Sequence, residues 1–142
     1  MMVWLTLSSM ITKKQSGYKE AIMGKITIGC FSSLVGSMSL DFAVKLSEAA
    51  VKKGHEVDLW LSGNGTMLGK KGQSKFRDYS YLMDTVTELI KSGKFKITNC
   101  EACAKARGIS REDTVEGFGV ASMDWYLASA FSTDRILHIG GE

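Results

Sequence analysis

The sequence predicts an α/β fold, in which a mainly parallel sheet carries helices on both faces. Short β-rich segments alternate along the chain with segments of helical periodicity, which is the pattern of βαβ units. Glycines follow several of the helical segments, at positions where a helix end favours a left-handed residue. A chain of 142 residues is long enough to bury one hydrophobic core, so a single domain is expected.

The N-terminal half is predicted to contain two strands joined by a helix. Residues 25–31 are rich in β-branched and aromatic side chains, which favour a strand. Residues 39–53 repeat apolar side chains at helical spacing and are followed by Gly54, which predicts an amphipathic helix and its end. Residues 56–61 alternate between polar and apolar types and are predicted as the second strand. The glycines within residues 62–75 predict a long loop.

The C-terminal half continues this alternation of strands and helices. Helical spacing of apolar residues predicts a helix at 78–91, and acidic first-turn residues predict another beginning at Ser110–Asp113. Ser122 is a preferred N-cap residue and predicts a helix at 123–131. β-Rich composition predicts three more strands, at residues 94–99, 118–121 and 135–139.

Composition excludes several classes of protein. The net charge of +3 is too small for the basic surface of a nucleic-acid-binding domain, so we expect no direct contact with nucleic acid. The apolar run at the N-terminus is too short to span a bilayer, so we expect no membrane association. Residues 1–22 contain an apolar run followed by a polar one, unlike the rest of the chain. They are predicted to be an N-terminal extension, followed by one domain at 23–142. Three cysteines make no disulfide framework and indicate a reducing, cytoplasmic location.

The strongest chemical candidates are Cys100 and Cys103, directly after the third predicted strand. We expect Cys100 in the first turn of a short helix that Gly108 ends, where free N–H groups and the helix dipole favour a thiolate. Its pKa is therefore expected to lie below that of free cysteine. Helical spacing puts the Cα atoms of the pair roughly 5–6 Å apart, within reach of a disulfide. The ends of parallel strands also bring the segments at 32–37 and 62–75 to this edge.

No cofactor or metal is expected. One CxxC pair provides two ligands where structural zinc needs four, and Cys30, His55 and His138 have no paired spacing. The Gly/Ser turn at 32–37 lacks the endings of nucleotide-binding loops. Cys30 ends the first strand, about 10 Å from Cys100 if the second strand lies between them, and is predicted to be a core residue.

The two histidines and the two aromatic residues near the start of the 123–131 helix are assigned surface, structural or packing roles. His55 is expected to be exposed, and His138 is expected to be structural. Trp125 and Tyr126 are interpreted as core or subunit-packing residues, with lining of a thiol pocket as the alternative.

Three segments in order resemble the DsrE/DsrF family. The frame is Cys100, a few small residues and Arg107-Gly108-Ile109, then Glu116-Gly117-Phe118-Gly119-Val120-Ala121-Ser122, and Asp134-Arg135 at the last strand. The first strand with its Ser/Gly turn also fits, and the resemblance covers about residues 24–138.

The resemblance implies a three-layer α/β/α fold with a five-stranded parallel sheet. It also implies a cytoplasmic oligomer, often a trimer or hexamer, or a hetero-oligomer with sister subunits, that exchanges sulfur with donor and acceptor proteins. The family's persulfide-bearing cysteine falls on Cys100. The chain departs at Cys103, where sulfur-relay members carry a small residue without a thiol.

The leading hypothesis is a cysteine-persulfide sulfur carrier or sulfurtransferase in which Cys100 accepts sulfane sulfur and Cys103 resolves or modulates it. One alternative is a CxxC thiol–disulfide oxidoreductase or redox sensor, which would use a reversible Cys100–Cys103 disulfide. The other is a non-catalytic oligomeric scaffold whose thiols are buried and inert.

Overall fold

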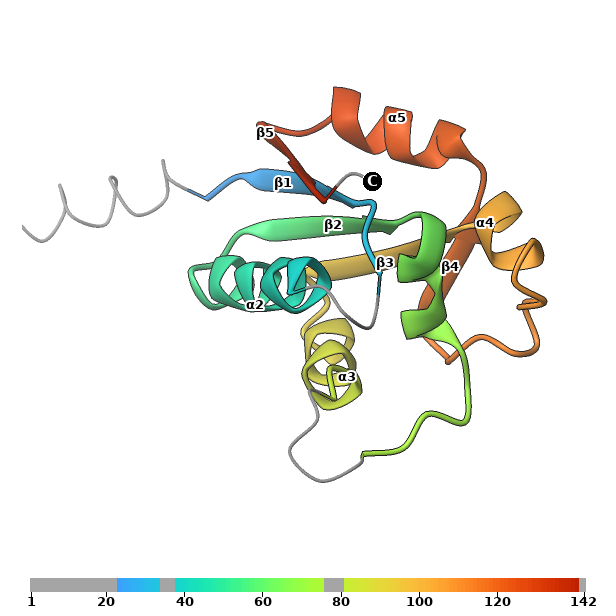
Figure 1. The fold of residues 1–142 in the computed structure, drawn as a ribbon. Coiled ribbons are helices and arrows are strands. Elements are labelled where there is room, and N and C mark those ends of the chain that lie inside the picture. The colour runs from blue at the N-terminus through green and yellow to red at the C-terminus, as the bar shows by residue number, and fades with distance from the viewer. Residues whose placement is uncertain (1–22, 34–37, 76–80, 141–142) are drawn as a thin grey trace, which may run out of the picture.

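Five parallel strands form the centre of the molecule in the computed structural model, which describes residues 23–33, 38–75 and 81–140. The strands are β1 (Lys25–Cys30), β2 (Glu56–Leu61), β3 (Phe95–Cys100), β4 (Phe118–Ala121) and β5 (Arg135–Ile139). Their order is β4-β3-β2-β1-β5, so β2 is central and β4 and β5 are the edges (Figure 1). The predicted α/β class with a five-stranded parallel sheet is therefore confirmed.

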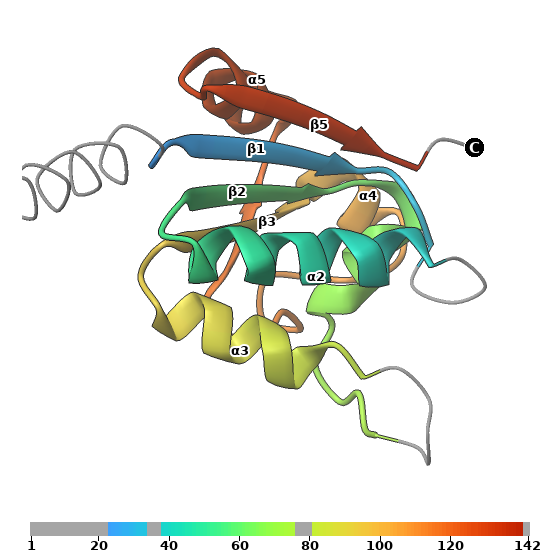
Figure 2. The ribbon, with the colours of Figure 1, turned by 90° about the vertical axis from the view of Figure 1, so that its left-hand side faces the viewer.

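Helices cover both faces of the sheet and make three layers. The helices are α2 (Ser39–Lys52), α3 (Met83–Lys91), α4 (Glu101–Lys105) and α5 (Met123–Phe131), together with the 3₁₀ helix η1 (Gly63–Gly69). Helices α2 and α3 lie on one face and α5 on the other, while α4 and η1 stand at the edge where the strands end (Figures 1 and 2). No helix among the described residues is both long and apolar enough to cross a bilayer.

The larger core lies between the sheet and the helices α2 and α3. Alternate residues of the strands point to this face, among them Ile28, Leu59 and Ile97, and the apolar stripe of α2 packs on them. Each fully buried aliphatic side chain contributes roughly 1.5–3 kcal/mol relative to exposure. Cys30 is fully buried in this core, and β2 separates its strand from that of Cys100, as predicted.

A buried polar cluster fastens α5 to the opposite face. Ser129 of α5 donates a hydrogen bond to the Asp58 carboxylate, and its Oγ lies 2.8 Å from Thr27 Oγ1. Thr27 and Asp58 are partners across the β1–β2 ladder, and the Lys25 ammonium lies 2.6 Å from Asp58 Oδ2. Because the buried carboxylate is paired and hydrogen-bonded, it stabilises the docking of α5 at this position.

Two predicted elements differ from the structure. Residues 62–75 are not all loop, since Gly63–Gly69 form η1. Ser110–Asp113 does not begin a helix. The Asp113 carboxylate accepts hydrogen bonds from Ser110, as at a helix start, but this turn does not continue as a helix. The stop has a tertiary cause, because Thr114 forms a β-bridge with Lys70 and the next backbone N–H bonds to the end of η1.

Two other sequence predictions concern residues that lie outside the part of the chain that the structure describes. The described part of the third helix begins at Met83, and residues 76–80, where it was predicted to begin, lie outside that part. The predicted extension at residues 1–22 also lies outside it.

Candidate functional site

Cys100 lies at the junction of β3 and α4. It was expected in the first helical turn, but it is the last residue of β3, with extended backbone, and the helix begins at Glu101. The reason is strand pairing, because Cys100 pairs with Ala121 of β4 and stays in the ladder. Gly108, with φ of +66°, ends the segment as predicted.

The side chain of Cys100 is surrounded by aromatic rings. It points to the α5 face, where it is only 8% exposed and packs in a cluster with Trp60 and Tyr126. Trp60 stacks on Trp125 and on Tyr126, with ring centroids 6.0 and 5.8 Å apart. The sulfur therefore lies in a largely apolar box rather than on an open helix end.

The expectation of a lowered pKa at Cys100 is wrong. Burial raises the pKa of this thiol, and its hydrogen bond to Cys103 raises it further. The backbone N–H groups of Ala102 and Cys103 lower the pKa, as a helix start should, but burial outweighs them. At neutral pH this thiol is thus held mainly in its protonated form.

The sulfur of Cys103 has the opposite character. Its side chain is partly exposed, and its Sγ lies 3.5 Å from Ser62 Oγ. Burial opposes ionisation, but hydrogen bonds donated by Ser62, Cys100 and the Gly63 backbone N–H, with the positive charge of Arg107, lower the pKa of Cys103 below its ordinary value. The two predicted site cysteines are therefore in contact, and the structure makes Cys103 the better thiolate.

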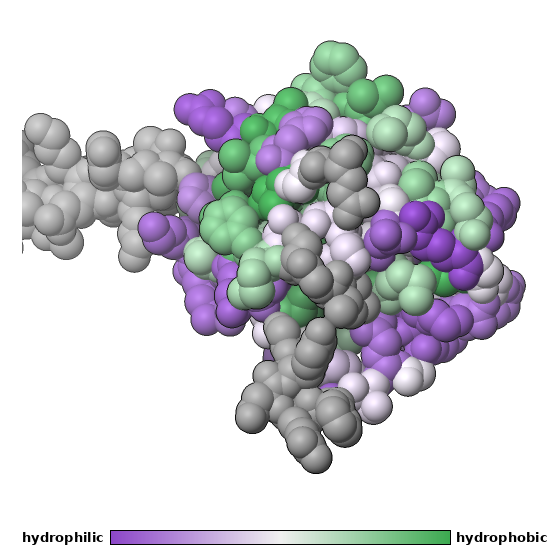
Figure 3. Space-filling model, viewed as in Figure 1, coloured by the Kyte–Doolittle hydropathy of each residue, from purple (hydrophilic) through white to green (hydrophobic). Residues whose placement is uncertain are grey.

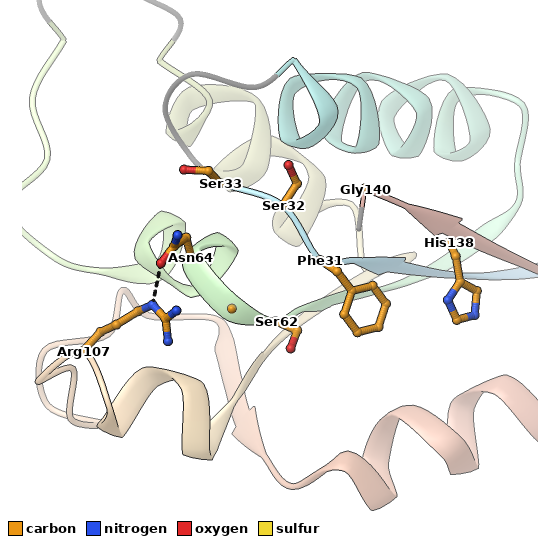
Figure 4. A pocket seen from close by; sticks show the side chains of 9 residues that line it. Phe31, Ser32, Ser33, Ser62, Asn64, Arg107, His138 and Gly140 are labelled. Atoms are coloured by element: carbon orange, nitrogen blue, oxygen red, sulfur yellow. Dashed lines mark hydrogen bonds between the residues drawn. The ribbon is translucent and has the colours of Figure 1, made fainter. Parts of the chain in front are cut away.

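An open cavity of about 530 Å³ lies beside this thiol, at the edge where β1, β2 and β5 end (Figure 4). Ser62 and Gly63, which hydrogen-bond the Cys103 sulfur, form one wall. Arg107 forms another, where its Nε donates to Asn64 Oδ1 at 2.8 Å and its Nη1 donates to the Cys103 carbonyl at 2.9 Å. The cavity thus combines a fixed cation with hydroxyl and amide groups, and it suits a small polar or anionic group.

His138 forms the far wall of the same cavity. Its ring stacks on Phe31, with centroids 5.7 Å apart, and its Nε2 lies 2.8 Å from Tyr126 Oη. His138 is exposed and faces the cavity, and these two contacts hold its ring. Trp125 and Tyr126 pack against the thiol cluster, which favours the pocket-lining interpretation of these two residues.

Sequence reasoning missed Trp60, which lies within β2 on the face of Cys100. The rule that placed Cys100 at the ligand-binding edge also brought the segment at 62–75 there. It did not single out Ser62 and Gly63, which follow directly after β2. The indole N–H of Trp60 is buried and has no hydrogen-bond acceptor among the described residues.

The remaining histidine and cysteine lie away from the thiol pair. Cys30 is buried on the other face of the sheet, and His55 accepts a hydrogen bond from the Gly24 N–H near the opposite edge. Within residues 23–33, 38–75 and 81–140, no three His, Cys, Asp or Glu side chains gather as metal ligands would.

A sequence model of the DsrE/DsrF-like family matches residues 25–139. Protein MK0008 of Methanopyrus kandleri is 37% identical over 95 residues, covering 67% of this chain and 77% of that protein. Protein MJ0989 of Methanocaldococcus jannaschii is 32% identical over 97 residues, covering 67% of this chain and 82% of that protein. Both relatives are described as uncharacterised.

Solved structures share the fold. The YchN protein of E. coli superposes with a TM-score of 0.72 at 23% identity, over 82% of this chain and 99% of that one. MTH1491 of Methanobacterium thermoautotrophicum gives a TM-score of 0.64 at 13% identity, over 80% and 97% of the two chains. At these identities the likeness concerns the architecture alone.

Proposed function

We propose that this chain, which belongs to the DsrE/DsrF-like family, is a sulfur carrier that stores a sulfane sulfur as a persulfide on Cys100. Membership in this family implies a role in sulfur relay. The observation that carries the finer proposal is the contact between the Cys100 and Cys103 thiols beside an open polar cavity. The aromatic box around Cys100 would protect a stored persulfide from water and from competing thiols.

The chemistry of a carrier is a pair of sulfur exchanges. A thiolate of the pair attacks the outer sulfur of a donor persulfide, a new S–S bond forms, and the donor leaves as a thiolate. An acceptor thiolate later attacks the stored outer sulfur in the same way and restores the cysteine. Each exchange breaks one S–S bond and forms another, so no net oxidation occurs.

The carrier function is tested by loading the reduced full-length protein with glutathione persulfide, removing the donor and weighing the intact chain. We expect the wild type to retain one extra sulfur atom, which fragmentation places on Cys100. The Cys100→Ser variant should lose this retained sulfur. Cys30→Ala is the matched control, because it removes a thiol from the opposite face of the sheet and should retain sulfur normally. Undiminished retention by Cys100→Ser would refute the assignment.

The contact between the two thiols also favours a second candidate, a dithiol–disulfide oxidoreductase. This function requires both thiols, because a Cys100–Cys103 disulfide must form and be reduced again. Catalysed reduction of a disulfide substrate that disappears in Cys103→Ser would support it. Retained sulfur in Cys103→Ser would instead support the carrier.

We further propose that the carrier works in the cytoplasm with donor and acceptor proteins. Three free cysteines suit a reducing compartment. Assembly with copies of itself, as a trimer or hexamer, or with sister subunits, belongs to the same proposal.

A further inference from the structure

The sulfur of Cys103 is more accessible to an incoming sulfur donor than the sulfur of Cys100. Cys100 is only 8% exposed and packs in a cluster with Trp60 and Tyr126. Cys103 is partly exposed, and Ser62 and Gly63 link its sulfur to the wall of the open cavity. A donor that enters the cavity therefore meets the environment of Cys103 before that of Cys100.

The groups around Cys103 are arranged for a negatively charged sulfur. The Ser62 hydroxyl, the Gly63 N–H and the Cys100 thiol all donate hydrogen bonds to it. Arg107 is the charged group in this set, and its guanidinium is fixed in place by Asn64 and by the Cys103 carbonyl. The groups that stabilise the thiolate come from η1, β3 and the end of α4. The fold itself therefore favours an ionised sulfur at Cys103.

We propose that Cys103 is the entry nucleophile, which takes the sulfane sulfur from the donor in the cavity and passes it inward to Cys100. This inference rests on the sulfur-carrier function proposed above and adds a first step to it. Cys103 becomes a catalytic residue in its own right, and Cys100 becomes the storage site.

The first step is an ordinary sulfur exchange. The Cys103 thiolate attacks the outer sulfur of the protonated donor persulfide, the donor S–S bond breaks, and the departing donor sulfur takes up the proton and leaves as a thiol. The product is a persulfide anion on Cys103, which inherits the hydrogen-bond donors that held the thiolate.

In the second step the Cys100 thiol first passes its proton to the outer sulfur of this persulfide. The resulting Cys100 thiolate attacks that outer sulfur, the Cys103 S–S bond breaks, and Cys103 returns to its thiolate form. The products are a Cys103 thiolate and a protonated Cys100 persulfide, so atoms and charge balance without an oxidant or reductant. Since a sulfur of lower pKa leaves faster, the different settings of the two thiols favour transfer in this direction.

The first experiment measures thiol reactivity without any sulfur donor. The reduced full-length protein is treated with iodoacetamide over a range of pH, and fragmentation of the peptide that carries both cysteines reports each thiol. We expect Cys103 to react first and at lower pH than free cysteine. Ser62→Ala should move its profile to higher pH. The control variant Ser132→Ala, which removes a hydroxyl at the C-terminal end of α5, should leave the pH profile of Cys103 unchanged. Faster reaction of Cys100, or an unmoved profile in Ser62→Ala, would overturn the proposal.

The second experiment follows loading by glutathione persulfide over time. We expect Cys103→Ser to load about tenfold or more slowly, because the remaining thiol presents little thiolate, and then to reach the wild-type level on Cys100. Cys100→Ser should take up sulfur on Cys103 quickly and lose it when the donor is removed. Wild-type loading speed in Cys103→Ser would overturn the entry role and leave the carrier function standing. A wild type that stores no sulfur would overturn both.

Discussion

Cys100 and Cys103 show how strongly a side chain's surroundings decide its chemistry. They are three residues apart, yet burial raises the pKa of one and hydrogen bonds lower the pKa of the other. In the folded state Cys103, whose pKa is lowered, ionises before Cys100. Its reactivity should therefore persist as pH falls below the ordinary cysteine range. Reactivity at Cys100 should appear only as pH rises above that range.

Trp60 is a second residue whose surroundings point to a role. Its indole N–H is buried in the cluster that contains Cys100 and is left without an acceptor in the described part of the chain, an arrangement that costs stability. We interpret it as a donor kept for the outer sulfur of a Cys100 persulfide.

We therefore predict that Trp60→Phe shortens the lifetime of the stored persulfide, because the ring remains and the N–H is lost. The measurement is the decay of the retained sulfur by intact mass after the donor is removed. Trp125→Phe is the matched control, since Trp125 stacks on Trp60 and its indole nitrogen is not an unpartnered buried donor. An equal lifetime in wild type and Trp60→Phe would exclude this role.

At the scale of the elements, α5 decides whether the box around Cys100 exists. Tyr126 and Trp125, on its first turns, cover the thiol cluster, and Ser129, one turn later, fastens the helix to Asp58. The residues that cover the thiol cluster and the residue that anchors the helix thus lie on the same short helix. Displacement of α5 would therefore expose Cys100.

We predict that Ser129→Ala lowers the free energy of unfolding by about 1.5–3 kcal/mol, since it removes a hydrogen bond to a buried charged group. Urea denaturation followed by tryptophan fluorescence measures the change. The matched control is Ser132→Ala, where the hydroxyl bonds only to a helix-end carbonyl and the residue is exposed, so a change within about 0.5 kcal/mol is expected. Equal effects of the two substitutions would show that the Asp58 cluster does not anchor α5.

Secondary structure was predictable where its causes are local. Hydrophobic spacing with a glycine stop located α2, the cap residue Ser122 located α5, and β-rich composition located the strands. The edge rule placed the thiol pair at the strand ends. The failures had distant causes. No helix begins at Ser110 because Thr114 pairs with Lys70 in a β-bridge, and Cys100 stays in the strand because it pairs with Ala121.

At the scale of the whole molecule, apolar surface gathers beside the edge strand β5. Phe131 of α5 is 90% exposed, and the other members of this patch are Met123, Leu127 and, on the α5 face of β5, Ile136. Figure 3 shows apolar residues over α5 at the upper rim of the molecule. An exposed edge strand with an apolar neighbour is typical of a protein contact surface, which supports the proposed assembly.

We predict that Phe131→Glu reduces the oligomeric mass measured by light scattering on a sizing column, without loss of the folded far-ultraviolet signal. The reason is that a charge in an apolar contact must be desolvated on assembly. Met38→Glu is the control, because Met38 is also exposed but precedes α2 on the other face. An unchanged mass in Phe131→Glu would place the contact elsewhere.

By itself, the sequence determined the α/β class, the order of most elements, the family frame and the position of the thiol pair at the end of the third strand. Each of these depends on short-range spacing, which is written along the chain. Only the tertiary structure decided which sulfur is protected and which is ionised. That difference comes from Trp60, Ser62 and Gly63 on β2 and η1, and from Tyr126 on α5, which folding brings to Cys100 and Cys103 across large separations in sequence. Burial and hydrogen bonding act through space, so the ionisation of a thiol follows the packed neighbours rather than its motif.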